Sequence, residues 1–470
     1  MTVKIKFCGG ARTVTGSMHL VSTDRSNVLL DCGIFHGRRD ESYDVNSNFA
    51  FNPQDLNACI ISHAHIDHCG NLPTLIKKGY KSHIFATPPT KELCHYMLPD
   101  SGYVHEEDIR YVNKINKRRG LPPRAPLYTR RDSEDALRYI RSVEYHRKFA
   151  VSKDIDLTFF EAGHILGSAV TILDIKTSRN KIRLAYAVDL GRYDMPLLRD
   201  PEIPKDIDYL ILESTYGGRA HSSIREAEDK LTDAVNRTVK RGGKIIIPSF
   251  ALERTQLIVF FISELIKRKK IKRIPIYVDS PLAVNLTKVF RQNWEYFDDT
   301  TKEAFSREGD PLGYGNIKYI TKVNDSKKLN NEKRPMIIIS ASGMCENGRI
   351  LHHLKNNIES PHNTILVIGF MAKNTLGRRI VEKEETVKIF GQPHQLNAEV
   401  VTLNAFSSHA DKNGLVQYAK GCGGKLKQVF IVHGEEEQSE ILRTNIKKLN
   451  IKTQIPAKDE IVFLSSREKR

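Results

Sequence analysis

The sequence predicts an α/β protein in which one domain is inserted into another. Short apolar runs typical of strands fill the first part of the chain. From about Thr215, buried β-branched runs alternate with helical patterns, which indicates a parallel sheet covered by helices. Strands with polar ends return near the C-terminus. We therefore expect one domain from residues 1–215 and 393–470, interrupted by a second domain at 216–392.

The elements of the first domain are assigned from their periodicity. Early strands are expected at 3–7, 28–30 and 56–62. Charged helices are expected at 106–119 and 133–143. Later strands are expected at 157–161, 169–175, 182–189, 209–213 and 428–432. The links between the strands from 157 to 213 favour antiparallel pairing.

The inserted domain has a strand–helix–strand rhythm. Helices are expected at 223–240 and 254–267. Buried strands are expected at 244–248, 275–278, 335–339 and 365–369.

Composition limits the classes of protein to which the chain can belong. Its 470 residues are enough for two or three domains with buried cores. No apolar run reaches about 18 residues, so no membrane span or membrane partner is expected. The seven cysteines form no CxxC pair, which favours reduced thiols and a cytoplasmic protein. A formal net charge of +17 indicates a polyanionic partner such as nucleic acid.

Residues 63–68, His-Ala-His-Ile-Asp-His, carry the strongest functional signal. They follow an apolar run and precede Asn71 and Pro73, which suit the start of a helix. Three imidazoles and a carboxylate therefore lie in a turn between a strand and a helix. Zinc binds neutral imidazole and carboxylate, and a catalytic zinc keeps one position open for water. A polar loop with incidental histidines is the weaker alternative.

Ligand-type residues recur where other apolar strands end. Each is an acidic residue or a histidine, followed in most cases by glycine or another small residue. They are Asp31, His164, Asp189, Glu213 and His433. Taken singly, each is better explained as a polar cap. Together with the cluster at 63–68, they predict a metal site built on strand ends.

These motifs resemble those of the metallo-β-lactamase superfamily. Asp31 matches the first motif, residues 63–68 the second, His164 the third and Asp189 the fourth. The resemblance implies a four-layer αββα domain. Within the superfamily the chain is similar to the β-CASP nucleases, whose second α/β domain is inserted into the first. It is close to the RNA endonuclease subunit of the cleavage and polyadenylation specificity factor and its prokaryotic relatives.

Three further residues carry the β-CASP resemblance. Glu213 in Leu-Glu-Ser-Thr-Tyr-Gly matches motif A, His409 in Ser-His-Ala-Asp matches motif B, and His433 in Val-His-Gly-Glu matches motif C. A histidine at motif C accompanies members of the family that act on RNA. The resemblance therefore covers essentially the whole chain and points to RNA as substrate.

The resemblance implies two zinc ions and a set of ligands for each. The first set would be His63, His65 and His164, the second Asp67, His68 and His433, with Asp189 bridging. Paired zinc ions hold a hydroxide that attacks a phosphodiester in line, leaving a 5′-phosphate and a 3′-hydroxyl. Asp67, Asp189 and Asp31 are expected to serve catalysis through the metals.

Three of these residues have expected roles outside the metal ligands. Asp31 is expected to orient a ligand imidazole. His409 is expected to protonate the leaving 3′-oxygen, and Glu213 is expected to hold its other ring nitrogen.

The inserted domain is expected to contact substrate phosphates. The candidates follow buried strands or open a helix, where small residues let backbone amides approach an anion. They are Ser249, Arg254, Ser340, Ser342, Gly343 and Arg378. Helix capping and tight turns explain the same residues equally well.

The predicted activity is hydrolysis of single-stranded RNA by an endonuclease, with a 5′-to-3′ exonuclease mode left open. A homodimer and partners in a processing complex are both compatible with it. The alternatives are a DNA nuclease, a thioester or lactone hydrolase on the same scaffold, and an inactive scaffold subunit. The motif C histidine argues against the first, the insert and the +17 charge against the second, and the intact ligand set against the third.

Overall fold

The computed structural model describes residues 2–178, 180–313, 317–369, 371–372, 374–403 and 405–465. It divides into two compact units. The first contains Met1–Ala220 and Ser408–Arg470, and the second contains His221–Ser407. No helix among the described residues is long and apolar enough to cross a membrane.

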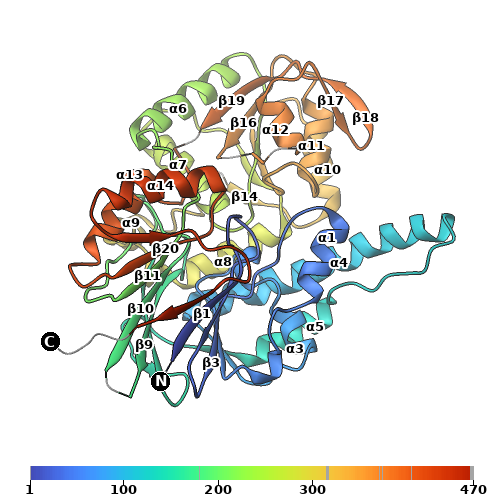
Figure 1. Ribbon diagram of the computed structural model, residues 1–470. Coiled ribbons are helices and arrows are strands. Elements are labelled where there is room, and N and C mark those ends of the chain that lie inside the picture. The colour runs from blue at the N-terminus through green and yellow to red at the C-terminus, as the bar shows by residue number, and fades with distance from the viewer. Residues whose placement is uncertain are drawn as a thin grey trace. The chain divides into compact units, whose positions relative to one another are not determined.

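Two sheets form the first unit (Figure 1). One has the order β22-β1-β2-β3-β4-β5-β6, and the other β21-β20-β11-β10-β9-β8-β7. The strands of the first are β1 (Val3–Gly9), β2 (Met18–Ser22), β3 (Asn27–Leu30), β4 (Ala58–Ile60), β5 (His83–Ala86), β6 (Ile140–Ser142) and β22 (Ile461–Leu464). Those of the second are β7 (Phe149–Ala150), β8 (Ile155–Glu161), β9 (Ala169–Lys176), β10 (Lys181–Ala187), β11 (Tyr209–Leu212), β20 (Gln428–Ile431) and β21 (Lys452–Gln454).

The core of the first unit lies between its two sheets. Val28 and Ile60 from one sheet belong to the same buried cluster as Leu157 and Leu184 from the other. The opposite face of the second sheet is covered by helices α13 and α14. The helices of this unit are α1 (Arg39–Ser47), α2 (Ile66–Cys69), α3 (Leu72–Lys77), α4 (Pro88–Arg118), α5 (Arg130–Ala136), α13 (Lys412–Gly421) and α14 (Glu436–Lys447).

The second unit is a parallel sheet flanked by helices. Its order is β14-β13-β15-β12-β16-β19, and every pairing in it is parallel. The strands are β12 (Ile245–Pro248), β13 (Ile276–Val278), β14 (Ile317–Tyr319), β15 (Ile337–Ser340), β16 (Thr364–Ile368) and β19 (Glu399–Leu403), with a separate hairpin of β17 (Thr386–Ile389) and β18 (Gln392–Gln395). The helices are α6 (Ile224–Lys240), α7 (Arg254–Lys267), α8 (Pro281–Gln292), α9 (Asp299–Glu308), α10 (Val323–Asn331), α11 (Ile350–Asn357) and α12 (Leu376–Val381).

The predicted α/β class and the parallel sheet of the insert are confirmed. The structure ends the second unit at Ser407, later than the expected residue 392. The reason is that β19 pairs along its full length with β16 and so belongs to the sheet of the second unit. The first boundary, at Ala220, lies close to the expected residue 215.

Three local expectations were correct only in part. The helix expected at 106–119 is only the end of α4, which begins at Pro88. The helix expected at 133–143 ends at Ala136, because the chain then turns and adds β6 to the edge of the first sheet. Pairing from β8 to β10 is antiparallel as expected, but β10 and β11 are parallel. The long connection after β10 lets the chain return before β11 begins.

Candidate metal centre

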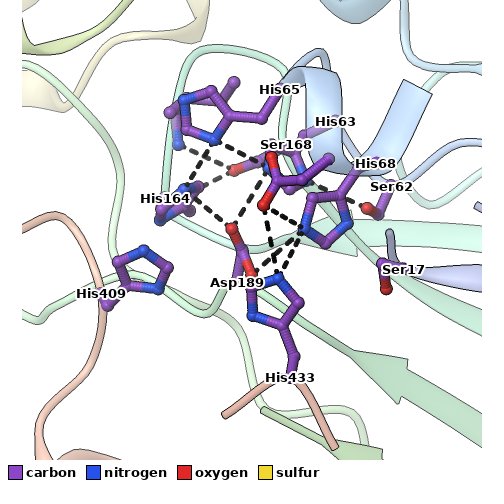
Figure 2. Close-up of polar contacts among 12 residues, drawn as sticks. Ser17, Ser62, His63, His65, His68, His164, Ser168, Asp189, His409 and His433 are labelled. Atoms are coloured by element: carbon purple, nitrogen blue, oxygen red, sulfur yellow. Dashed lines mark hydrogen bonds and ion pairs between the residues drawn. The ribbon is translucent and has the colours of Figure 1, made fainter. Parts of the chain in front are cut away.

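The metal ligands expected from the sequence meet in one place in the first unit (Figure 2). They form two groups whose ligand atoms lie within 4.8 Å of one another: His63, His65, His164 and Asp189, and separately Asp67, His68 and His433. The residues come from α2, from the loop before it and from the segments that follow strands β8, β10 and β20. Most of these side chains are fully buried, while Asp67 is 25% exposed.

Imidazole nitrogens face one another in the first group. The Nδ1 atom of His65 lies 3.0 Å from Nε2 of His63 and 3.3 Å from Nε2 of His164. Four ligands placed tetrahedrally at the usual Zn–N distance are about 3.3 Å apart. These separations therefore fit a group of ligands around one small divalent cation.

The second group has the same spacing. Nε2 of His68 lies 3.2 Å from Nε2 of His433 and 3.8 Å from Oδ2 of Asp67. Oδ2 of Asp67 is 3.5 Å from Nε2 of His433. Two imidazoles and a carboxylate leave room for a shared or external oxygen ligand.

Asp189 faces both groups. Its Oδ2 atom lies 3.4 Å from Nε2 of His63 and 3.4 Å from Nε2 of His164. Its Oδ1 atom lies 3.4 Å from Nε2 of His68 and 3.0 Å from Nδ1 of His433. A carboxylate placed in this way can bridge two cations, one through each oxygen.

Burial sets the protonation of the first group. Burial, assisted by the neighbouring His63, lowers the pKa of His65 to about 3. Burial also lowers the pKa of His63 and of His164. Neutral imidazoles present the lone pair that a metal requires, so these histidines are ready for binding at neutral pH.

His68 behaves differently because it lies among carboxylates. Burial opposes its charged form, but Asp189, Asp67 and Asp31 together raise its pKa well above the usual value. A divalent cation next to Asp189 and Asp67 would take over the role of that proton.

Asp31 orients His68 from behind. Its Oδ2 atom lies 2.7 Å from Nδ1 of His68, so that Nε2 points to the site. The same carboxylate accepts hydrogen bonds from the Ser62 amide at 2.7 Å, the Ser62 hydroxyl at 2.8 Å and the Tyr186 hydroxyl at 2.8 Å. Ser17 in turn contacts the Tyr186 hydroxyl at 2.9 Å.

Ser17, Ser62 and Tyr186 were not identified from the sequence. Ser62 directly precedes the histidine cluster, and its position could have suggested a supporting role. Tyr186 lies three residues before Asp189 but within an apolar strand, and Ser17 lies outside the motifs, so neither was marked by a sequence signal for contact with Asp31.

The backbone is held in an unusual conformation at three of these residues. Asp31, Asp189 and His433 directly follow strands β3, β10 and β20 or come within two residues of them, with φ angles of 57°, 51° and 47°. Left-handed backbone is uncommon for residues with a side chain, and such strain gathers at functional sites. Each strand end therefore turns its ligand sharply out of the sheet direction.

Gly33 allows the two main loops of the site to touch. A Cβ atom at this position would lie 1.6 Å from the carbonyl oxygen of Asp67. Next to it, the Cys32 amide donates to the His68 carbonyl at 2.8 Å. The loop after Asp31 thus holds α2, which carries Asp67 and His68, against the end of β3.

Glu213 and His409 form a pair beside the metal groups. Nδ1 of His409 lies 3.2 Å from both carboxylate oxygens of Glu213. Backbone amides of Leu190 and Thr215 also donate to Glu213, at 2.6 and 3.3 Å. The His409 ring lies 4.5 Å from the His164 ring, centre to centre, and its side chain is 17% exposed. His409 thus borders the metal site and faces solvent.

Most of the residues expected to contact phosphates already have partners inside the second unit. Ser249 and Ser340 lie together at the ends of paired strands, but the Ser340 hydroxyl donates to the Asp279 carbonyl at 2.8 Å. The Arg254 guanidinium donates to the Phe406 carbonyl at 2.5 Å.

The remaining phosphate candidates also have nearby partners. Arg378 is paired with Glu382 at 2.7 Å, and Ser342 accepts from the Glu346 amide at 3.3 Å. A Cβ atom on Gly343 would lie 2.7 Å from the Phe250 ring. Their role toward RNA stays a prediction.

Fold and site together define a metallo-β-lactamase-type hydrolase with an inserted domain. Family models match in the same arrangement: a metallo-β-lactamase superfamily domain at residues 20–194, a Beta-Casp domain at 255–380, and a Zn-dependent metallo-hydrolase RNA specificity domain at 393–456. The chain belongs to the β-CASP family of the metallo-β-lactamase superfamily. The family resemblance found in the motifs is thereby confirmed.

Several known proteins are similar over most of the chain. A ribonuclease of Thermus thermophilus is 33% identical and covers 92% of this chain and 93% of its own length. An RNase J-like protein of Methanocaldococcus jannaschii is 31% identical, over 98% of this chain and 99% of its own length. The transcription termination factor FttA of the same organism is 30% identical, over 93% of this chain and 67% of its own. A solved structure of a protein of unknown function from Enterococcus faecalis shares the fold, with a TM-score of 0.55 and 12% identity over 99% of this chain and 100% of its own.

Proposed function

We propose that this protein is a zinc-dependent ribonuclease that hydrolyses phosphodiester bonds of single-stranded RNA, leaving a 5′-phosphate and a 3′-hydroxyl. The observation that carries the proposal is the position of Asp189, whose two oxygens face two separate groups of metal-ligand type. Sites with two metals in such proximity serve in-line displacement at phosphorus.

Two zinc ions fit the donor set best. His63, His65 and His164 would hold one ion, and Asp67, His68 and His433 the other, with Asp189 shared. Imidazole-rich sets of this kind suit zinc, whereas magnesium prefers oxygen ligands. When bound, the ions would supply Lewis acidity and an activated water for attack on the phosphate.

The residues of the chain itself have distinct tasks in this proposal. His409 is placed to give a proton to the leaving 3′-oxygen, because its ring borders the metal groups and reaches solvent. Glu213 accepts from Nδ1 and so keeps the other nitrogen directed toward substrate. Asp31 fixes the His68 ring so that Nε2 faces the metals.

RNA is the favoured substrate for several independent reasons. Relatives that align over nearly the whole chain carry the names ribonuclease and RNase J-like protein. The C-terminal region matches a domain model named for RNA specificity. The net charge of +17 suits a polyanion.

End-mapping of cleavage products tests the proposal. Purified zinc-loaded protein would be incubated with 5′- or 3′-labelled single-stranded RNA and with DNA of the same sequence. We expect RNA fragments with 5′-phosphate and 3′-hydroxyl ends and much slower cleavage of DNA. Equal cleavage of DNA, 2′,3′-cyclic phosphate ends, or turnover of a thioester without RNA cleavage would each contradict it.

A further inference from the structure

A basic groove lies in the second unit, where helices α6 and α7 end. It has a volume of about 1070 Å³. Its cationic lining comprises Lys240, Lys267, Lys269, Lys270, Lys272 and Arg273. Val239, Ile266 and Ile271 supply an apolar part of the lining. We call this surface the basic groove.

The positive charge of the basic groove is only partly neutralised. Lys267 pairs with Glu264 at 3.1 Å, and Lys270 lies 3.8 Å from a carboxylate oxygen of Glu228. Lys240, Lys269 and Lys272 form a second set. They are exposed and have no ion-pair partner within the parts of the chain that the structure describes.

Helix termini explain one part of this charge. Lys240 and Lys267 lie in the last turns of α6 and α7, where a cation stabilises the carbonyl end of a helix. Lys269 and Lys272 lie beyond the end of α7, and the dipole effect falls off within the last turn. The cations past the helix end therefore need another explanation.

The basic groove differs from the phosphate site expected at the strand ends. α6 leads into the start of β12, and α7 leads into the start of β13. Because the sheet is parallel, the groove lies at its amino edge, whereas Ser249 and Ser340 lie at its carboxyl edge. A four-residue strand such as β12 separates the two edges by about 13 Å. One phosphate cannot contact both.

We propose that the basic groove binds the sugar–phosphate backbone of RNA, outside the segment that is cleaved. Unpaired lysines bind phosphates and release counterions, which supplies affinity without reading sequence. No aromatic side chain lines the groove, so base stacking contributes nothing and the binding tolerates any sequence. This inference rests on the proposed function, because it assumes that the anion held there is the substrate.

A triple variant tests the groove directly. Lys240→Ser, Lys269→Ser and Lys272→Ser would be combined in the full chain. The matched control combines Lys318→Ser, Lys327→Ser and Lys388→Ser, three exposed lysines of the same unit that lie outside the groove. Both proteins lose three charges, so any difference between them reports position and not net charge.

Two RNA substrates separate the groove from the catalytic site. For an RNA of about 40 nucleotides we expect the groove variant to raise Kd at least about tenfold at low salt. The slope of log K against log salt should become shallower by about 2, since each lost phosphate contact removes about 0.7 on a single strand. Cleavage of an RNA of about 6 nucleotides should stay within about twofold of the parent, which also shows that the variant folds.

Each other outcome overturns the inference. An equal loss of affinity for long RNA in both triple variants would mean that only net charge matters. Unchanged binding of long RNA, together with lost binding of poly-glutamate, would assign the groove to an acidic protein partner. If the parent itself neither binds nor cleaves RNA, the proposed function fails first, and that result is recognised before any variant is compared.

Discussion

Asp189 is the residue whose carboxylate faces both ligand groups. Each of its oxygens lies within 3.4 Å of two imidazole nitrogens, one from each of two histidines. Its left-handed backbone turns the carboxylate away from the direction of β10, so both oxygens reach the site.

Replacing His409 separates proton transfer from metal binding. His409→Ala should keep both metals, because His409 belongs to neither ligand group. It should lower the cleavage rate by about 10²- to 10⁴-fold, the usual contribution of a positioned general acid. Single-turnover cleavage of labelled RNA and elemental analysis of the purified protein measure the two effects. A variant that cleaves as fast as the parent would remove His409 from the mechanism.

Weakening the support behind His68 should lower metal affinity. Asp31→Asn keeps the shape of the side chain but removes the negative charge that faces Nδ1 of His68. We expect affinity for zinc to fall about 10- to 100-fold, as is usual when such a partner is lost. Competition with a chelator dye measures it.

Tyr186→Phe is the matched control for this change. It removes one hydrogen bond to Asp31 and leaves the contact to His68 in place. Its effect on zinc affinity should be much smaller. Equal losses in both variants would show that general packing, and not orientation of His68, sets the affinity.

Among the elements, three parallel strands bring functional residues to one edge. β10, β11 and β20 pair side by side in the same direction. Asp189, Glu213 and His433 follow their ends and therefore emerge together. Strand direction alone thus explains how residues distant in sequence come within 4.8 Å of one another.

The sequence predicted these residues but not the sheet that aligns them. Each ligand follows an apolar run, and that local pattern is visible without any fold. The parallel pairing of β10 and β11 depends on how the long loop between them returns, and the hydrogen-bonding partner of a strand leaves no local trace. The support from Tyr186 to Asp31 was hidden for the same reason, because two distant strands create it.

Glu161, at the end of β8, should make stability depend on pH. Burial raises its pKa from 4.5 to about 8. Because the folded pKa lies above the unfolded one, the unfolded state binds fewer protons between these values. The contribution of this group to the free energy of unfolding is fully present below about pH 4.5 and is lost as pH rises through about 8.

Glu161→Gln tests this linkage. The glutamine stays neutral and keeps an oxygen that can accept from the Gly163 amide, which donates to Glu161 at 2.9 Å. We expect the melting temperature of the parent to fall more steeply than that of the variant between about pH 6 and about pH 9. Glu384→Gln, a change of an exposed carboxylate, should follow the parent. Parallel curves for parent and Glu161→Gln would contradict a raised pKa.

Considered as a whole, the chain combines two units with separate cores. The first unit carries both ligand groups, although its two segments are separated in sequence by the second unit. His409 and His433 therefore come after the insert in the sequence, yet they belong to the site of the first unit. The sequence indicated this order through the return of strands with polar ends, whereas the basic groove required the three-dimensional arrangement of two helix ends.

Removal of metal should destabilise the first unit selectively. A ligand that binds only the folded state stabilises it by about 4 kcal/mol at a free concentration 1,000-fold above Kd. For a unit of this size that corresponds to a melting temperature about 7 °C lower after chelation. Calorimetry with and without a zinc chelator should show one part of the unfolding heat moving and the remainder, from the second unit, staying in place. A His63→Ala, Asp189→Ala variant should already melt at the lower temperature and ignore the chelator. If both parts of the transition moved together by the same amount, the two units would unfold as one, and metal binding would stabilise the entire chain.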